Sequence, residues 1–331
     1  MKKIIAFILL LIFSSFSFVS CDFVKNLFDF TGESIFDPPG FYEGVQYDLD
    51  MNMDYPVPDT MPDGEGKRIK VILLLGQSNA SGCSAGLYLK ENIGEKAYSV
   101  YENGFDNVLI NYCIDNHNAT SEGAFVKVDT TCGAYGGAFG PELGMAEVLS
   151  NEFPDEQIII LKYTMSGYTI NYHWLLKGNR GDIYEAFLEF VKTYMGYLES
   201  KNYDARIGAV CWMQGESDTT EHKASKYYDN QVKFVNYLRE DLNVYAEEKG
   251  IYFIDAGISN SPYCEPAYPQ INEAKERFSH LSEMNIYFST IELGFTVHKE
   301  PEGDPDWGHY DSLSELELGR EFAKRIVDIY N

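Results

Sequence analysis

The sequence predicts an α/β protein built as a three-layer α/β/α sandwich with a central parallel sheet. Two observations carry this prediction. Apolar runs alternate along the chain with amphipathic stretches at helical spacing. Several of these runs are almost continuously apolar, which is typical of parallel strands that are buried on both faces. Strands that alternate with helices imply right-handed crossovers, which place helices on both faces of the sheet.

The first 20 residues predict a lipoprotein-type export signal. Two lysines precede an unbroken apolar run, residues 4–13, which is too short to span a membrane. The segment Phe18-Val19-Ser20-Cys21 resembles a bacterial lipobox, so Cys21 is the expected lipidation site. We therefore expect an exported lipoprotein of the bacterial cell envelope, periplasmic or surface-exposed. Cleavage after Ser17 and free secretion is the less favoured alternative.

The rest of the chain divides into a linker and one domain. Residues 21–66 are rich in Pro, Gly, Asp and Asn without a sustained period, which indicates a tether. The domain spans 67–331, and its expected strands are 69–75, 157–163, 207–212, 251–256 and 286–291. The expected helices are 141–152, 183–198, 226–248, 271–284 and 313–330. Residues 83–135 are the least regular, and we interpret them as an insertion of loops over one end of the sheet.

Composition excludes some partners. The chain of 331 residues has 26 Lys and Arg against 51 Asp and Glu, a formal net charge of −25. Such an acidic chain lacks the basic footprint that binds nucleic acid, and an anionic membrane surface would repel it. We therefore expect membrane contact only through the lipid anchor. No metal-ligand spacing is present, and neither a metal nor a cofactor is expected. Cys113 and Cys132 are one possible disulfide pair, although spacing does not determine pairing.

The first predicted strand ends in a candidate nucleophile. In open parallel α/β sheets, sites form where loops leave the carboxyl ends of the strands. The first strand runs directly into Gly76-Gln77-Ser78-Asn79-Ala80-Ser81-Gly82. A serine on such a tight turn is presented at the edge of the sheet beside free backbone N–H groups, which is suitable geometry for a nucleophile. Taken alone, a serine in this position more often only makes a turn.

Polar residues also follow the second and third strands. The third strand ends in Cys211-Trp212-Met213-Gln214-Gly215-Glu216-Ser217-Asp218. The Gln214 amide can donate to a developing oxyanion, and Glu216 can orient a base or bind sugar hydroxyls. The second strand leads into Ser166 and Gly167, and the backbone N–H of Gly167 is a candidate for the same oxyanion hole.

A candidate base precedes the last predicted helix, in the segment Asp306-Trp307-Gly308-His309. At this spacing on a turn, the Asp306 carboxylate can accept a hydrogen bond from Nδ1 of His309, which leaves Nε2 free to take a proton from a serine. Together with Ser78, the segment supplies a nucleophile, an orienting acid and a base in the chain order Ser, Asp, His.

Three blocks carry a resemblance to a known family: GQSNASG, WMQGESD and DWGHYDSLSELELG. They resemble the sialate O-acetylesterase-like group of SGNH hydrolases, also classified as carbohydrate esterase family six, over about residues 68–330. The resemblance implies an SGNH or flavodoxin-like sandwich. It also implies that Ser78 is the nucleophile, His309 the base and Asp306 the acid, with Glu216 as the alternative acid.

The resemblance further implies an oxyanion hole and a substrate. The hole would comprise the amides of Ser78 and Gly167 and the side chain of Gln214, which replaces the Asn that names the SGNH class. The expected activity is that of an exported serine esterase that removes O-acetyl groups from carbohydrates, either acetylated polysaccharide or sialic acid, through an acetyl-serine intermediate. The charge of −25 slightly favours a neutral polysaccharide.

Four side chains are expected to bind the substrate: Gln77, Asn79, Trp174 and Trp307. The two tryptophans would stack on sugar rings. Two other functions stay open. One is a non-catalytic surface glycan-binding lipoprotein, and the other is a general carboxylesterase or lipase on the same fold. The oligomeric state is not predicted.

Overall fold

The computed structural model describes residues 49–331. Its strands are β1 (Arg68–Gly76), β2 (Ser84–Ala85), β3 (Val108–Ile114), β4 (Ala119–Thr120), β5 (Val126–Lys127), β6 (Ala138–Phe139), β7 (Ile158–Thr164), β8 (Leu175–Leu176), β9 (Asn179–Arg180), β10 (Asp204–Met213), β11 (Tyr252–Ala256) and β12 (Asn285–Phe288). Its α-helices are α3 (Ser78–Ser81), α4 (Gly86–Ile93), α5 (Glu95–Asn103), α6 (Pro141–Glu152), α7 (Asp182–Ser200), α8 (Glu221–Asp241), α9 (Tyr268–Ser279) and α10 (Ser312–Tyr330). A π-helical turn η1 (Ile170–Trp174) and the 3₁₀ turns η2 (Glu216–Asp218) and η3 (Asn243–Tyr245) complete the elements.

The central sheet is mostly parallel. Its strand order is β12-β11-β10-β1-β7-β3-β4, and β5 also pairs with β3. The pairs from β12 to β3 are parallel, whereas β4 and β5 join β3 in antiparallel orientation. The prediction of a parallel central sheet is confirmed, with two short antiparallel strands added at one edge.

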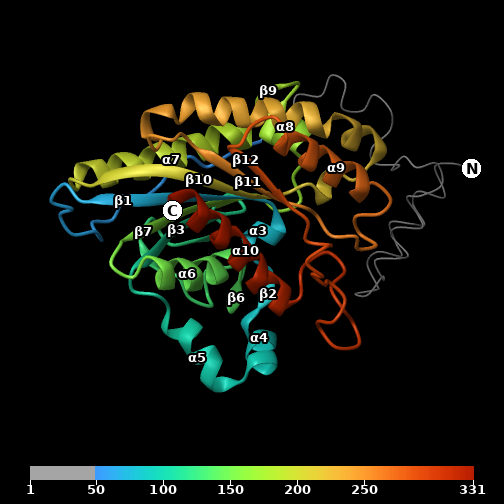
Figure 1. The fold of residues 1–331 in the computed structure, drawn as a ribbon, viewed down its shortest axis with the longest axis horizontal. Coiled ribbons are helices and arrows are strands. Elements are labelled where there is room, and N and C mark those ends of the chain that lie inside the picture. Colours follow the sequence, from blue (N-terminus) through green and yellow to red (C-terminus); the bar gives the residue numbers. More distant parts are fainter. Residues whose placement is uncertain (1–48) are drawn as a thin grey trace, which may run out of the picture. The chain divides into compact units, whose positions relative to one another are not determined.

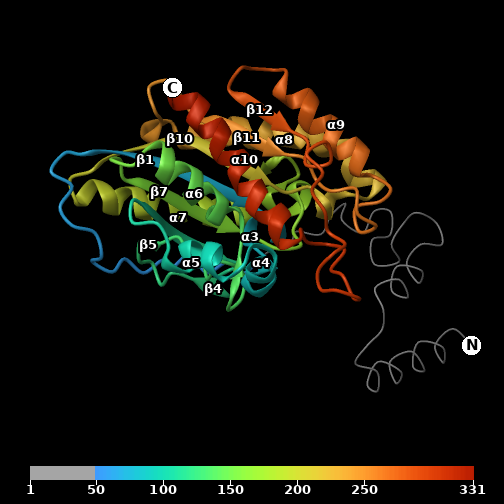
Figure 2. The same ribbon diagram turned by 60° about the horizontal axis from the view of Figure 1, so that its bottom comes forward.

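Helices cover both faces of this sheet, which confirms the predicted three layers (Figures 1 and 2). The long helices α7 and α8 lie on one face, and α6 and α10 lie on the other. The helices α6 and α10 cross closely because glycines stand at the contact. A Cβ at Gly144 would lie 2.0 Å from the Leu316 carbonyl oxygen, and one at Gly319 would lie 1.9 Å from that of Pro141. This close crossing fixes the start of α10 and the segment that precedes it.

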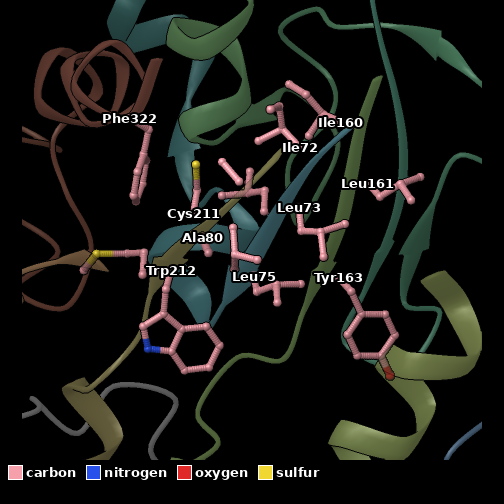
Figure 3. Packing of buried hydrophobic residues seen from close by; sticks show 14 of the residues in the cluster. Ile72, Leu73, Leu75, Ala80, Ile160, Leu161, Tyr163, Cys211, Trp212 and Phe322 are labelled. Atoms are coloured by element: carbon pink, nitrogen blue, oxygen red, sulfur yellow. The ribbon is translucent and has the colours of Figure 1, made fainter. Parts of the chain in front are cut away.

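The core is continuous through the sheet. Leu73 and Leu75 of β1, Trp212 of β10 and Tyr163 of β7 are at most 1% exposed, and Phe322 reaches the core from α10 (Figure 3). Burying a side chain such as Leu or Phe contributes about 1.5–3 kcal/mol each. Because β1 is buried on both faces, it forms a rigid support for the residues at its carboxyl end.

The interpretation of residues 83–135 as an insertion of loops is wrong. The segment contains α4, α5 and β3, and β3 pairs in parallel with β7 inside the main sheet. The apolar run of β3 is broken by Asn111, which is nevertheless 0% exposed and donates from Nδ2 to the Gly123 carbonyl. A buried polar residue with an internal partner thus concealed a strand of the sheet.

Residues 49–66 have no helix or strand, and they pack against the domain. Tyr55 is 7% exposed and donates from its hydroxyl to the Ala186 carbonyl, and Met61 is 5% exposed. This part of the predicted tether is therefore attached to the surface of the domain. The predicted signal at 1–20, Cys21 and the first part of the tether lie outside the described residues. Within residues 49–331, no helix is long and apolar enough to cross a membrane.

Candidate active site

Ser78 lies at the carboxyl end of β1, where the strand turns into α3. Gly76 makes this turn possible, because its φ is +145° and a Cβ would lie 1.9 Å from the Met213 carbonyl oxygen. Gly76 pairs with Met213 of β10 and with Thr164 of β7, so these three strands end level with one another. The segments that begin at Gln77, Gln214 and Met165 consequently leave the sheet at one edge. Ser78 is partly exposed there and begins the helix.

The segment before α10 presents a histidine–carboxylate pair. Nδ1 of His309 lies 2.7 Å from Oδ2 of Asp306, and Oδ1 of Asp306 accepts from the Gly308 N–H at 2.9 Å. The His309 side chain is 30% exposed and that of Asp306 is 53% exposed. This pair has the geometry in which a carboxylate fixes the orientation of an imidazole and leaves Nε2 for other partners.

Asn79 joins the histidine segment to the serine segment. Its Nδ2 donates to the Gly308 carbonyl at 3.3 Å, and its Oδ1 accepts from the Tyr310 N–H at 3.1 Å. These two partners flank His309, and Asn79 directly follows Ser78. The side chain of Asn79 therefore holds the hydroxyl-bearing and imidazole-bearing segments against one another, although they are 231 positions apart in the chain.

Glu216, the alternative acid, is buried and contacts Asn79. It is 2% exposed, and its Oε1 accepts from Nδ2 of Asn79 at 2.7 Å. Burial raises the pKa of Glu216, against the opposing effect of the Asn79 hydrogen bond. Its other oxygen, Oε2, has no hydrogen-bond partner among the described residues. Because the carboxylate bonded to His309 is that of Asp306, the geometry favours Asp306 over Glu216 as the orienting acid.

The contact between Asp306 and His309 shifts the pKa of both residues. Burial alone would lower the pKa of His309, but the hydrogen bond to Asp306 and the neighbouring Cys83 outweigh burial and raise it to about 10. The hydrogen bond from His309 lowers the pKa of Asp306. The site therefore stabilises the imidazolium ion, which is the species that forms when the histidine accepts a proton.

The structure corrects the expected role of Gln214. The side chain is 0% exposed, and its Nε2 donates to Oδ2 of Asp218 at 2.7 Å and to the Tyr168 carbonyl at 3.2 Å. Its Oε1 accepts from the Tyr227 hydroxyl at 3.0 Å. An amide whose donors are already used inside the protein is not available to an oxyanion. Gln214 instead supports the loop after β10.

The backbone candidates for an oxyanion hole lie at the shared strand edge. Gly167 follows β7, is exposed and has a φ of +78°. Ser78 is the first residue of α3, where the backbone N–H groups have no partner within the helix. With Gln214 removed from the set, the amides of Ser78 and Gly167 remain as the candidate donors at this edge.

Three of the four side chains expected to bind the substrate are buried in the protein. Trp174 is 0% exposed and packs edge-on against Trp212. Gln77 is 2% exposed, and its Oε1 accepts from the N–H groups of Gly215 and Ser217. Asn79 is 1% exposed and makes the internal bonds described above. Trp307 alone of the four is on the surface, 45% exposed and stacked on His298.

Sequence reasoning missed Cys83. This half-buried residue lies five positions after Ser78, and its proximity helps to raise the pKa of His309. The hydroxyl of Tyr135 donates to the Cys83 carbonyl at 2.5 Å. The only signal in the sequence was the closeness of Cys83 to the nucleophile segment. Cys113 and Cys132, the suggested disulfide pair, are both free thiols.

Comparisons with known proteins identify the family. A family model described as "Carbohydrate esterase, sialic acid-specific acetylesterase" matches residues 68–328. A protein of Arabidopsis thaliana named "Probable carbohydrate esterase" is 28% identical over 191 residues, which is 53% of this chain and 65% of that relative. The chain thus matches just under two thirds of the length of this relative.

Three solved structures share the fold. The structure of the same Arabidopsis protein has a TM-score of 0.57 at 17% identity, covering 78% of this chain and 98% of that one. NanS has a TM-score of 0.55 at 15% identity, with coverages of 81% and 98%. A carbohydrate acetylesterase from Xanthomonas citri has a TM-score of 0.51 at 15% identity, with coverages of 78% and 55%. With the family match across nearly the whole domain, this chain belongs to the sialic acid-specific acetylesterase family of carbohydrate esterases.

Proposed function

We propose that this protein is a serine esterase that removes O-acetyl groups from carbohydrates through an acetyl-serine intermediate. The observation that carries the proposal is the Asp306–His309 pair, which Asn79 holds beside the Ser78 segment. Membership of a carbohydrate esterase family supports the choice of ester and of substrate class.

In the proposed mechanism, Oγ of Ser78 attacks the acetyl carbonyl carbon while Nε2 of His309 takes the hydroxyl proton. The carboxylate of Asp306 holds the ring by Nδ1 and stabilises the imidazolium ion. The amides of Ser78 and Gly167 donate to the oxyanion of the tetrahedral intermediate. His309 then protonates the departing sugar oxygen, and a water molecule hydrolyses the acetyl-serine.

A neutral acetylated polysaccharide is the substrate that the local charges favour. The carboxylate of Asp306 is 53% exposed beside His309, and the chain as a whole carries a formal net charge of −25. Negative charge near the base opposes the approach of another carboxylate such as that of sialic acid. Trp307 is exposed beside the base and offers a flat apolar face to a sugar ring.

Acetate release tests this proposal directly. Purified protein is incubated with acetylated xylan, acetylated mannan and O-acetylated sialic acid, and free acetate is measured against Ser78→Ala as the matched control. We expect release from the neutral polysaccharides in the native protein only. Equal release by Ser78→Ala would refute the serine mechanism. Preference for p-nitrophenyl octanoate over p-nitrophenyl acetate would instead favour a lipase-like esterase.

We also propose that the protein is exported and anchored through a lipid on Cys21. The apolar run and lipobox-like segment at the amino terminus support this proposal. Metabolic labelling with a fatty acid should tag the native chain in a bacterial host but leave Cys21→Ser unlabelled. Equal labelling of both proteins, or of neither, would contradict the lipidation of Cys21.

A further inference from the structure

The loop after β7 carries Gly167, whose backbone N–H is a candidate donor to the oxyanion. This N–H lies in the planar peptide group that joins Ser166 to Gly167, so the orientation of Ser166 sets its direction. Gly167 itself is exposed and has a φ of +78°. Met165, the first residue of the loop, is tied to β1, because its N–H donates to the Gly76 carbonyl at 2.9 Å. The placement of the Gly167 donor therefore depends on what holds Ser166.

Asp115 holds the backbone of Ser166. Its Oδ1 accepts from the Ser166 N–H at 2.5 Å, although the two residues are 51 positions apart. Asp115 is in turn fixed to β7, because its own N–H donates to the Thr164 carbonyl at 2.9 Å. On the other side, Oγ of Ser166 lies 3.2 Å from Oγ of Ser81, the buried last residue of the helix that begins with Ser78. Ser166 is thus held between Asp115 and the nucleophile segment.

Asp115 begins the turn between β3 and β4, and this turn has an unfavourable backbone. Asp115, Asn116 and His117 have φ values of +50°, +53° and +73°, which places three consecutive residues other than glycine in the left-handed region. A Cβ is crowded there, and residues other than glycine enter this region singly rather than in runs. Such a conformation persists only where the surrounding structure holds it. The turn therefore needs contacts from outside itself.

Residues 52–55, which precede β1, supply those contacts, and we call them the strap. Oδ1 of Asn116 accepts from the Asn52 N–H at 2.8 Å, and Nε2 of His117 lies 3.0 Å from the Asn52 carbonyl oxygen. The ring of Tyr55 stacks on that of His117, with centroids 5.2 Å apart and an angle of 13° between the planes. Tyr55 is buried against α7, so the strap is itself anchored to the domain.

We propose that Asp115 is a positioning residue for the oxyanion hole and that the strap keeps it in place. The strap holds the turn, the turn carries Asp115, and Asp115 fixes the Ser166 backbone that directs the Gly167 N–H. The proposal rests on the proposed serine mechanism, in which this N–H donates to the oxyanion. Because such a donor acts on the transition state more than on the bound substrate, loss of the support lowers kcat and leaves KM nearly unchanged.

Two substitutions of Asp115 in the full chain test its role, with p-nitrophenyl acetate as the substrate. Asp115→Ala removes the acceptor, and we expect kcat to fall about 10- to 100-fold, less than the roughly 100- to 1,000-fold for outright loss of an oxyanion donor. The KM should stay within about twofold of the native value. Asp115→Asn keeps an acceptor oxygen and should retain at least about a third of the native kcat. A native kcat in Asp115→Ala, or equal losses in both variants, would overturn the proposal.

A double substitution tests the strap. Asn116→Ala removes the side chain that bonds to the strap, and Asn118→Ala is the matched control, because Asn118 is exposed on the same turn. We expect Asn116→Ala to lower kcat about three- to tenfold and Asn118→Ala to leave it unchanged. Added to Asp115→Ala, Asn116→Ala should lower kcat no further, since both act through one contact. Equal rates for Asn116→Ala and Asn118→Ala, or losses that multiply in the double variant, would overturn the role of the strap.

Amide hydrogen exchange tests the placement of Ser166 independently of activity. Deuterium uptake at the Ser166 N–H is read by fragmentation mass spectrometry, with uptake in α8 as the reference for global folding. We expect exchange at least about tenfold faster in Asp115→Ala than in the native protein and in Asp115→Asn, at unchanged uptake in α8. Should Asp115→Ala fail to fold, Asn116→Ala provides the same comparison. Native exchange at Ser166 in the folded variant would overturn the proposal.

The exchange experiment also separates this proposal from the proposed function. If the native protein hydrolyses no acetyl ester, the proposed function fails. Exchange at Ser166 then still decides whether Asp115 holds the loop that carries Gly167.

Discussion

Replacing Asp306 by Asn separates the two acids that can orient His309. The substitution keeps the shape of the side chain but removes the negative charge that lies 2.7 Å from Nδ1. A hydrogen bond to a charged group contributes about 1.5–3 kcal/mol. Because Asp306 is 53% exposed, solvent screens the pair, and the lower end of that range applies. A loss of about 1.5 kcal/mol corresponds to a fall of about tenfold in kcat/KM.

The pH profile gives a second readout of the same variant. Activity requires neutral His309, so it rises with pH through the pKa of this residue, which Asp306 and Cys83 raise to about 10. Removing the carboxylate removes part of that increase, so the acid limb of Asp306→Asn should move to lower pH. The assay is p-nitrophenyl acetate hydrolysis from acid to alkaline pH, corrected for the spontaneous rate.

Glu216→Gln is the matched control. Asn79 can still donate to the new amide oxygen, so the contact that holds the two segments together is kept. We expect a change of less than about threefold in kcat/KM and no shift of the acid limb. A larger loss for Glu216→Gln than for Asp306→Asn, or an acid limb that does not move in Asp306→Asn, would refute the assignment of Asp306.

Four further outcomes are expected. Ser78→Ala should abolish turnover at an unchanged Tm, because Ser78 is partly exposed and the substitution removes a single hydroxyl group. Residual turnover near the native rate would remove Ser78 from the mechanism. Gln214→Ala should lower the Tm, because it leaves the buried polar groups of Asp218 and Tyr227 without this partner. Each unsatisfied group costs about 1–3 kcal/mol of stability. A loss of kcat at full stability would instead support a role of Gln214 in the oxyanion hole. Trp307→Ala should raise KM for a polysaccharide but not for p-nitrophenyl acetate, and an unchanged polysaccharide KM would count against stacking. Glu315→Gln should raise the Tm more at pH 8 than at pH 5. Burial raises the pKa of Glu315 in the folded protein, so this carboxyl group costs stability as the pH rises above its pKa in the unfolded chain. An equal change in Tm at both pH values would contradict this expectation.

The sequence was sufficient for the fold because periodicity and burial agree in most elements. β1 is apolar from Val71 to Leu75 and lies in the centre of the sheet, and the predicted helix at 141–152 has the bounds of α6. β3 was missed because its pattern contains Asn111, a polar residue that the fold buries with an internal partner. Sequence patterns record polarity but not whether a polar group finds a hydrogen bond inside the protein.

The candidate site was predictable where spacing alone sets the geometry. Asp306 and His309 are three residues apart on one turn, so their contact follows from local chain geometry. Side-chain direction is not set locally. Gln214 and Trp174 both lie near strand ends, yet each turns inward to partners from other elements. The contacts of Asn79 with the residues on both sides of His309 likewise depend on two distant segments that only the tertiary fold brings together.

Trapping the acyl-enzyme tests the central claim most directly. The native protein is mixed with excess p-nitrophenyl acetate, quenched in acid within the first turnovers and digested for mass spectrometry. The account predicts one acetyl group on the peptide that contains Ser78, assigned to its Oγ by fragmentation and missing from Ser78→Ala. An acetyl group on Cys83, or turnover without any acetylated serine, would contradict it.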